Sequence, residues 1–162
     1  MSDAPTELGE SVLVAETRLG RLQVAVRTAH AAFLADEPKS AGGLGSGPDP
    51  YELLAAALGA CTSMTLRLYA ERKDLPLERV SVSVRHRRAS LEAKDRFERT
   101  ITLEGPLDEE QRARLLWIAE RCPVHRTLER GAEIATAFAP SEPEPTAGVT
   151  PEHMRDMEQA CA

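Results

Sequence analysis

Residues 47–73, GPDPYELLAAALGACTSMTLRLYAERK, constrain the fold more than any other stretch, because they predict one long helix. Asp49 is placed to cap this helix, and Pro50 to occupy its first position, where a missing N–H costs nothing. Glu52 stands where the carboxylate of a capping box reaches back to the cap. We therefore expect the rest of the chain to be arranged around this helix.

The first half of the predicted helix carries no charge on any face. Residues 53–61 read LLAAALGAC, and charges return only at Arg67. A helix that is apolar all round is a buried one, so we expect the first half to lie in the core and the second half to emerge. Cys61 lies in the middle of the helix, with hydroxyls beside it at Thr62 and Ser63.

Composition argues against several classes of function. The 162-residue chain has a formal charge of -6 and only 4% aromatic residues, which disfavours a nucleic-acid partner. No apolar run reaches the ~18–20 uncharged residues of a membrane span, and the acidic N-terminus does not read as a secretory signal. Three cysteines do not suggest a disulfide scaffold. We expect a cytoplasmic protein with one main domain and no membrane partner.

Period-2 alternation of apolar residues predicts strands on both sides of the helix in the sequence. The expected strands are residues 12–18, 21–27, 80–84 and 97–103, and residues 29–35 are either a further strand or an extended segment. The first two form a hairpin that turns at Leu19 and Gly20, and strands 80–84 and 97–103 form a hairpin with one buried face. Residues 36–50 are rich in glycine and proline, so they form a long loop that leads into the helix.

A second helix is expected after Gly105, with Asp108 and Gln111 as a capping box. Its buried face ends at Cys122, and Pro123 then opens a short third helix. Residues 132–139 predict a final short strand. No repeated βαβ unit occurs, so the fold class is α+β with antiparallel sheets.

The chain is expected to consist of a domain, residues 1–139, and a Pro- and Glu-rich linker with a short tail, residues 140–162. Within the tail, residues 151–162 are interpreted as a short charged helix that carries Cys161 and forms an appendage.

Cys61 and Cys122 are both predicted to point into the core. A buried free cysteine is commonly an inert small hydrophobic residue. A chemical role requires a means to form the thiolate, access for a substrate and a resolving partner. Cys61 lies too far into its helix for the helix dipole to lower its pKa, whereas Cys122 lies at a helix start. The residues alone leave both interpretations open.

Two motifs resemble the OsmC/Ohr family of osmotically inducible and organic hydroperoxide resistance proteins. The first is P-x-E-L…A-A…C, ending at Cys61, and the second is C-P-V-x-x-x-L, beginning at Cys122. The resemblance covers residues 12–139 and implies an OsmC-like fold, with antiparallel sheets around a long central helix in an intertwined homodimer.

The resemblance also implies an activity, that of a thiol-dependent peroxidase that reduces organic hydroperoxides in the oxidative stress response. Cys61 would form a sulfenic acid and Cys122 would resolve it as a Cys61–Cys122 disulfide. A dithiol reductant of the lipoyl or thioredoxin type would restore both thiols. No cofactor and no metal are implied.

The chain departs from the family pattern at the groups that activate the cysteine. The peroxidases carry a glutamate directly after the helix-starting proline, where this chain has Tyr51, with Glu52 one residue further on. The arginine that this glutamate holds would be Arg18 or Arg21, while the loop before the helix offers only Lys39. Arg18 and Arg21 can equally be solvated hairpin residues, and Glu52 a capping residue.

Two alternatives come from other classes of protein. Cys122 and His125, with His86 and Cys61, offer the ligand types of a zinc site, although a single C-x-x-H is weak support. His125 can instead help to hold the Cys122 thiolate. The second alternative is a non-catalytic OsmC-like dimer that binds an apolar ligand in its interface pocket. Tyr51 and Trp117 would then be pocket or packing residues.

Overall fold

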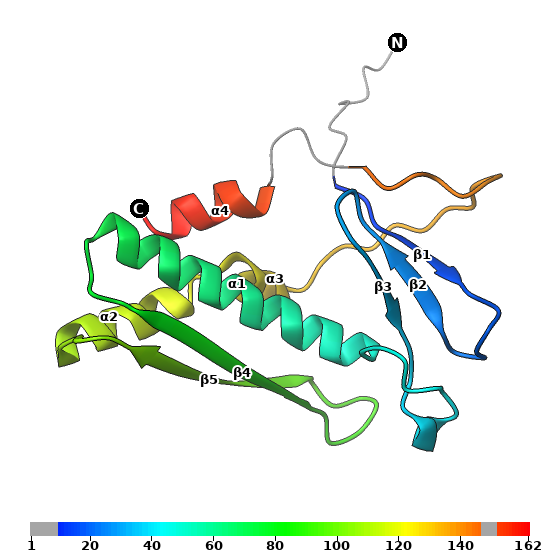
Figure 1. The fold of residues 1–162 in the computed structure, drawn as a ribbon, viewed down its shortest axis with the longest axis horizontal. Coiled ribbons are helices and arrows are strands. Elements are labelled where there is room, and N and C mark those ends of the chain that lie inside the picture. Colours follow the sequence, from blue (N-terminus) through cyan, green and yellow to red (C-terminus); the bar gives the residue numbers. More distant parts are fainter. Residues whose placement is uncertain (1–9, 147–151) are drawn as a thin grey trace, which may run out of the picture. The chain divides into compact units, whose positions relative to one another are not determined.

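The computed structural model describes residues 10–146 and 152–162, and Figure 1 shows the order of their elements. The chain divides into two compact units, one of residues 1–50 and 135–152 and the other of residues 51–134 and 153–162. The architecture is α+β, with two antiparallel sheets and one long helix. The fold class predicted from the sequence is therefore confirmed.

The first unit contains a three-stranded sheet in the order β1-β2-β3, formed by β1 (Leu13–Glu16), β2 (Val24–Arg27) and β3 (Ala32–Ala35). Val14 pairs with Val26, which confirms the predicted hairpin. Its turn is longer than expected and occupies residues 17–23. The reason lies at the ends of the turn, where the Thr17 hydroxyl donates to the side-chain carbonyl of Gln23 at 2.6 Å.

One buried carboxylate holds the loop before the long helix, which includes a short 3-10 turn, Lys39–Ala41. Asp36 is buried and accepts three backbone hydrogen bonds, from the N–H groups of Glu37, Leu44 and Ser46. The Ser46 hydroxyl also donates to Asp36 at 2.8 Å and accepts from the Gln23 amide at 2.7 Å. This network joins the loop to the β1–β2 turn.

The second unit is built on α1 (Pro50–Arg72) and a two-stranded antiparallel sheet of β4 (Arg79–Arg87) and β5 (Arg96–Glu104). Val82 pairs with Ile101, as the alternation predicts. After β5 the backbone of Gly105 has φ 127°, and a Cβ there would lie 2.1 Å from the carbonyl oxygen of Pro76. Only glycine allows this exit from the sheet.

Three further helices complete the second unit: α2 (Glu109–Ala119), α3 (Pro123–Arg130) and α4 (Glu152–Ala160). The capping box of α2 is confirmed. The Gln111 N–H donates to the Asp108 carboxylate at 2.8 Å, and the Asp108 N–H donates to the Gln111 side chain at 3.0 Å. Cys122 is the N-cap residue of α3, with Pro123 at the first helical position.

The distribution of burial along α1 is the reverse of the expected one. Its buried residues are Leu58, Cys61, Thr62, Thr65, Leu66, Tyr69 and Ala70. Five of these seven follow Cys61, in the second half of the helix, where Leu66, Tyr69 and Ala70 pack in one cluster with Leu115 and Ile118 of α2. The apolar first half lies along β4, with Gly59 facing Val84, and much of the rest of its surface is exposed. Apolar character alone therefore did not locate the core of the single chain.

The tail helix forms as predicted, but it is no appendage. Met157 and Cys161 are 5% and 2% exposed. The Cys161 thiol donates to the Thr65 carbonyl at 3.5 Å, and the Arg72 guanidinium donates to the Glu158 carbonyl at 2.9 Å. The tail is thus packed on the second half of α1, and its apolar residues belong to the same core.

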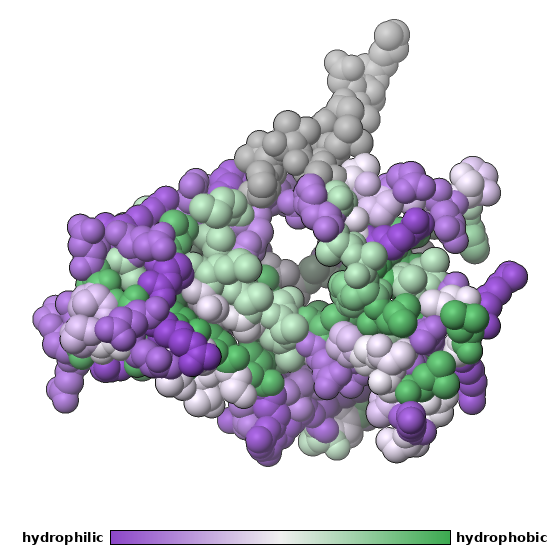
Figure 2. Space-filling view, viewed as in Figure 1, coloured by the Kyte–Doolittle hydropathy of each residue, from purple (hydrophilic) through white to green (hydrophobic). Residues whose placement is uncertain are grey.

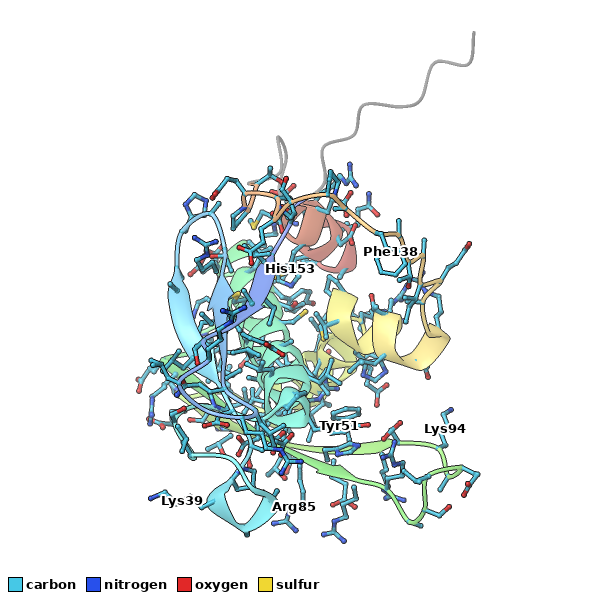
Figure 3. All side chains as sticks on the ribbon, turned by 90° about the vertical axis from the view of Figure 1, so that its right-hand side faces the viewer. Lys39, Tyr51, Arg85, Lys94, Phe138 and His153 are labelled. Carbon is cyan, nitrogen blue, oxygen red and sulfur yellow. The ribbon has the colours of Figure 1, made fainter. Side chains whose placement is uncertain are left out.

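The predicted strand at residues 132–139 is wrong, because these residues form no regular structure. A strand requires a neighbour to accept its backbone hydrogen bonds, and nothing among the described residues pairs with this segment. Ile134 is 87% exposed, and the labelled Phe138 projects into solvent (Figure 3).

By length and composition alone, α1 is long and apolar enough to cross a membrane, with a mean hydropathy of 1.3 over its most apolar window. This observation is weak, because 44% of that window is buried inside the structure and core helices meet the same description.

Candidate functional site

The second unit brings Cys61 of α1 and Cys122 of α3 into one small cluster. The two cysteines are 2% and 0% exposed, and Leu58 is buried beside them. Four partly buried apolar residues pack against them: Val84, Phe97, Val124 and Leu128. The prediction that both cysteines point into the core is confirmed.

The two thiols lie in the same cluster and influence each other's pKa, and each has further partners. The backbone N–H of Val124 donates to Cys61 Sγ at 3.4 Å. The hydroxyl of Thr62 lies 3.6 Å from Cys122 Sγ. Because α3 begins at Pro123, its first N–H groups have no partner within the helix and are free to face the sulfurs.

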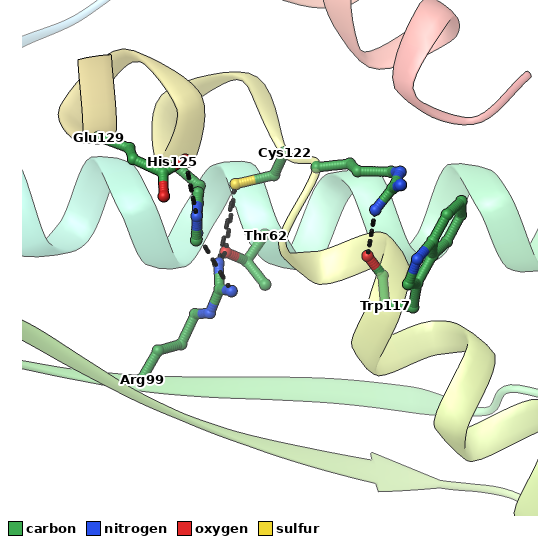
Figure 4. A network of polar contacts seen from close by, with 7 residues as sticks. Thr62, Arg99, Trp117, Cys122, His125 and Glu129 are labelled. Carbon is green, nitrogen blue, oxygen red and sulfur yellow. Dashed lines mark hydrogen bonds and ion pairs between the residues drawn. The ribbon is translucent and has the colours of Figure 1, made fainter. Parts of the chain in front are cut away.

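One cation, Arg99 of β5, faces Cys122 (Figure 4). Its Nη1 donates to the Thr62 hydroxyl at 2.8 Å and lies 3.9 Å from Cys122 Sγ. Its Nη2 lies 3.5 Å from His125 Nδ1. A guanidinium only donates, so His125 Nδ1 accepts and Nε2 carries the proton toward Glu129, 3.8 Å away.

These contacts separate the acidities of the two thiols. The hydrogen bond from the Cys61 thiol lowers the pKa of Cys122 most, and burial opposes this effect. The Thr62 hydroxyl, the backbone N–H of His125 and the charge of Arg99 lower it further, to about 5. The same bond to Cys122, together with burial, raises the pKa of Cys61. The pair therefore loses one proton readily, and the charge rests on Cys122.

The hydroxyl of Thr62 can donate only one hydrogen bond. It donates this bond to the Leu58 carbonyl at 2.7 Å, within α1. A neutral Cys122 thiol can then donate to the Thr62 oxygen, whereas a Cys122 thiolate can only accept. Ionisation of Cys122 therefore favours rotation of the hydroxyl from the Leu58 carbonyl toward the sulfur.

Tyr51, at the family's glutamate position, lies against the β4–β5 hairpin (Figure 3). Its ring stacks on His86 with the centroids 4.1 Å apart, and its hydroxyl accepts from Arg88 Nη1 at 3.1 Å. His86 is in turn 2.7 Å from an Asp95 oxygen. Glu52 lies in the first turn of α1. Tyr51 thus belongs to a polar cluster on the hairpin.

Arg18 and Arg21 belong to the turn of the first unit, with Lys39 in the 3-10 turn of the same unit. Arg18 has φ 62°, and the Arg21 guanidinium lies over Gly42. Their proposed role beside Cys61 stays a prediction. Among the described residues, no group of three or more His, Cys, Asp or Glu side chains could hold a metal ion.

Sequence reasoning missed Arg99, although a signal was present. Arg99 alternates with Phe97, Ile101 and Leu103 on the face of the strand that was expected to be buried. A charged residue on such a face requires a partner, and the partners here are Thr62 and Cys122.

The fold and the site define a class of protein: an α+β protein with a buried pair of cysteines at a helix start. The model of one family, OsmC-like protein, matches residues 43–137, which is more than half of the chain. The chain belongs to the OsmC-like protein family. It matches none of the curated protein sequences.

Solved structures share the fold. An OsmC-like protein from Mycoplasma pneumoniae is 18% identical, with 74% of this chain and 86% of that chain covered and a TM-score of 0.63. The organic hydroperoxide resistance protein OsmC from Legionella pneumophila is 22% identical, with 74% and 88% covered and a TM-score of 0.52. An organic hydroperoxide resistance protein from Elizabethkingia anophelis is 20% identical, with 76% and 91% covered and a TM-score of 0.58. At these identities the likeness shows the fold alone.

Proposed function

We propose that this chain is a thiol peroxidase that reduces organic hydroperoxides with the two electrons held by Cys61 and Cys122. The observation that carries the proposal is that the two buried cysteines share one cluster, in which Arg99 Nη1 lies 3.9 Å from Cys122 Sγ and its charge helps to lower the pKa of Cys122. Family membership and two hydroperoxide resistance proteins among the structural neighbours also support it.

In the proposed reaction the Cys61 sulfur attacks the outer oxygen of the hydroperoxide. Its proton passes to the Cys122 thiolate along the bond that joins the two sulfurs. The O–O bond breaks, the sulfur is oxidised to a sulfenic acid, and the alkoxide takes a proton and leaves as an alcohol. Cys122 then attacks the sulfenic sulfur, forming the disulfide and releasing water. A dithiol reduces this disulfide by exchange.

A cavity beside the cysteines supports an apolar substrate. It has a volume of about 220 Å³ and is lined by Tyr51, Leu54, Lys94, Asp95, Phe97 and Leu128. Phe97 and Leu128 also pack against the cysteine cluster, so these two side chains separate the cavity from the cysteines. The same cavity supports the alternative of a non-catalytic protein that binds an apolar ligand.

The test is oxidation of the reduced protein with one equivalent of an alkyl hydroperoxide, followed by mass spectrometry of the peptides. We expect a Cys61–Cys122 disulfide within minutes and none in Cys61→Ser. Trapping with a sulfenic acid reagent shows which of the two cysteines reacts with the hydroperoxide first. A trapped adduct on Cys61 in Cys122→Ser supports the order above, whereas an adduct only on Cys122 in Cys61→Ser reverses it. Three unreacted thiols would refute the peroxidase and favour the ligand binder.

We further propose that the protein is a homodimer whose partner covers the first half of α1. Tyr51 and Leu54 are 38% and 43% exposed in the single chain. Figure 2 shows apolar surface, in green, along this part of the molecule. Light scattering should give twice the chain mass. Leu54→Glu should shift the mass toward the monomer, whereas Leu91→Glu, on the exposed β4–β5 turn, should not. A monomeric wild-type chain would refute the proposal.

A further inference from the structure

A cavity of the second unit lies among α2, α3 and α4, and the thiol chemistry does not use it. Its volume is about 500 Å³. Its wall contains four arginines, Arg114, Arg121, Arg126 and Arg130. Asp156 and the last residue of the chain, Ala162, also line it, so the acidic groups in the wall are fewer than the arginines. A cavity of this size falls within the range of small-molecule sites.

The four guanidinium groups form no ion pair with any carboxylate of the described residues. Residues 10–146 and 152–162 contain seven other ion pairs, and the chain as a whole carries a formal charge of -6. A concentration of uncompensated positive charge in an acidic protein points to an anionic ligand.

Two of the arginines are held in place by neutral groups. The guanidinium groups of Arg114 and Arg121 lie 4.0 Å and 3.2 Å from the centre of the Trp117 ring. Arg114 Nε also donates to the Tyr69 hydroxyl at 3.0 Å, and Arg121 Nη1 to the Trp117 carbonyl at 3.5 Å (Figure 4). The stacking fixes both cations and leaves their charges available.

The other two arginines are on α3. Arg126 and Arg130 are one turn apart on the same face of the helix, and both side chains are exposed. Among the described residues, neither side chain makes a hydrogen bond. The cavity therefore combines two fixed cations with two adjustable ones.

We propose that this cavity binds a small molecule that carries two or more linked phosphate groups. A guanidinium group forms paired hydrogen bonds to phosphate oxygens. A ligand with a single carboxylate has too few oxygens to pair with four arginines, whereas linked phosphate groups have enough. The phosphates are either free, as in pyrophosphate, or part of a nucleotide. Arginine side chains already lie over the Trp117 ring, so the ring is not available to stack on a base. We therefore expect the arginines to recognise the ligand through its phosphate groups.

The test is calorimetric titration of the full chain with pyrophosphate, tripolyphosphate and ATP in separate experiments at low ionic strength. We expect saturable binding that weakens about tenfold or more in Arg126→Gln and Arg130→Gln, because each removes a charge-assisted hydrogen bond. Arg85→Gln is the control, because Arg85 lies on β4 and is exposed outside the cavity (Figure 3). Cys61→Ser should bind as the wild type does, since the site is independent of the thiol reaction.

The titrations distinguish the sources of the phosphate groups. Tighter binding of ATP than of tripolyphosphate assigns the site to a nucleotide, and equal binding assigns it to the phosphate chain alone. Binding of a poly-glutamate peptide as tight as that of tripolyphosphate would overturn the assignment to phosphate. Absence of binding, or an equal loss in Arg85→Gln, would overturn the site. Bound ligand should also slow alkylation of Cys161, which lines the cavity.

Discussion

Replacement of Arg99 by glutamine tests the electrostatic basis of the site. Arg99 Nη1 lies 3.9 Å from Cys122 Sγ. At this separation the attraction between a thiolate and a guanidinium is ~1 kcal/mol in water and ~4 kcal/mol at an effective dielectric constant of ~20. Because Arg99 is half-buried, we take ~2 kcal/mol, which corresponds to an ionisation constant about 30-fold smaller in Arg99→Gln.

The assay is the pH dependence of thiolate ultraviolet absorbance, taken as the difference between a protein and its Cys122→Ser counterpart. At one pH unit above the wild-type midpoint, the thiolate fraction of Cys122 should fall from about nine tenths to about a quarter in Arg99→Gln. Arg99→Lys retains the charge without the paired donors, so its thiolate fraction should lie between those of the wild type and Arg99→Gln.

Arg96→Gln is the control, because Arg96 is on the same strand but its side chain is 76% exposed and paired with Glu98. The reasoning is refuted if Arg99→Gln and Arg96→Gln leave the titration midpoint of Cys122 equally unchanged. It is also refuted if Arg99→Gln lowers the midpoint, since the loss of a nearby cation cannot favour a thiolate.

Three further predictions concern the hydroxyl, the pH dependence of stability and the tail. Thr62→Val should raise the pKa of Cys122, whereas Thr62→Ser should restore it, as the pH dependence of thiolate ultraviolet absorbance would show. The pKa of Cys122 is lowered on folding from 9.0 to about 5, so its ionisation stabilises the fold above pH 9 and this stabilisation disappears as the pH falls to about 5. The difference in urea unfolding free energy between the wild type and Cys122→Ser should become smaller as the pH falls from 9 to about 5. A difference that stays constant would contradict the lowered pKa of Cys122. Met157→Ala should cost ~2–5 kcal/mol of unfolding free energy, because Met157 is a buried core residue, whereas Met154→Ala, at a 40% exposed position, should cost much less. Equal small effects would mean that α4 is not docked in solution.

The local signals in the sequence predicted the elements well, because each acts over a few neighbouring residues. Asp108 and Gln111 placed the start of α2, and Cys122 followed by Pro123 placed the start of α3. Signals that depend on a distant partner failed. Residues 132–139 have the composition of a strand but no neighbour among the described residues, so the pattern alone misassigned them.

The site was predicted only in part for the same reason. The sequence placed Cys61 and Cys122 in the core, but it did not show which cation would approach them. The arginines considered, Arg18 and Arg21, came from the first hairpin by the family pattern. Arg99 instead lies on β5 and reaches the sulfur through the packing of β5 against α1 and α3. Likewise, the burial of Cys161 depends on the docking of α4, which no periodicity in the tail indicates.

The donors around Cys122 also bear on the reduction potential of the pair. Hydrogen bonds and positive charge stabilise the thiolate, which exists only in the reduced protein, and a disulfide would receive none of that stabilisation. A Cys61–Cys122 disulfide would therefore be a comparatively strong oxidant, easily opened by a dithiol. Arg99 would therefore favour the reductive half of the cycle, because it stabilises the Cys122 thiolate that forms when a dithiol opens the disulfide.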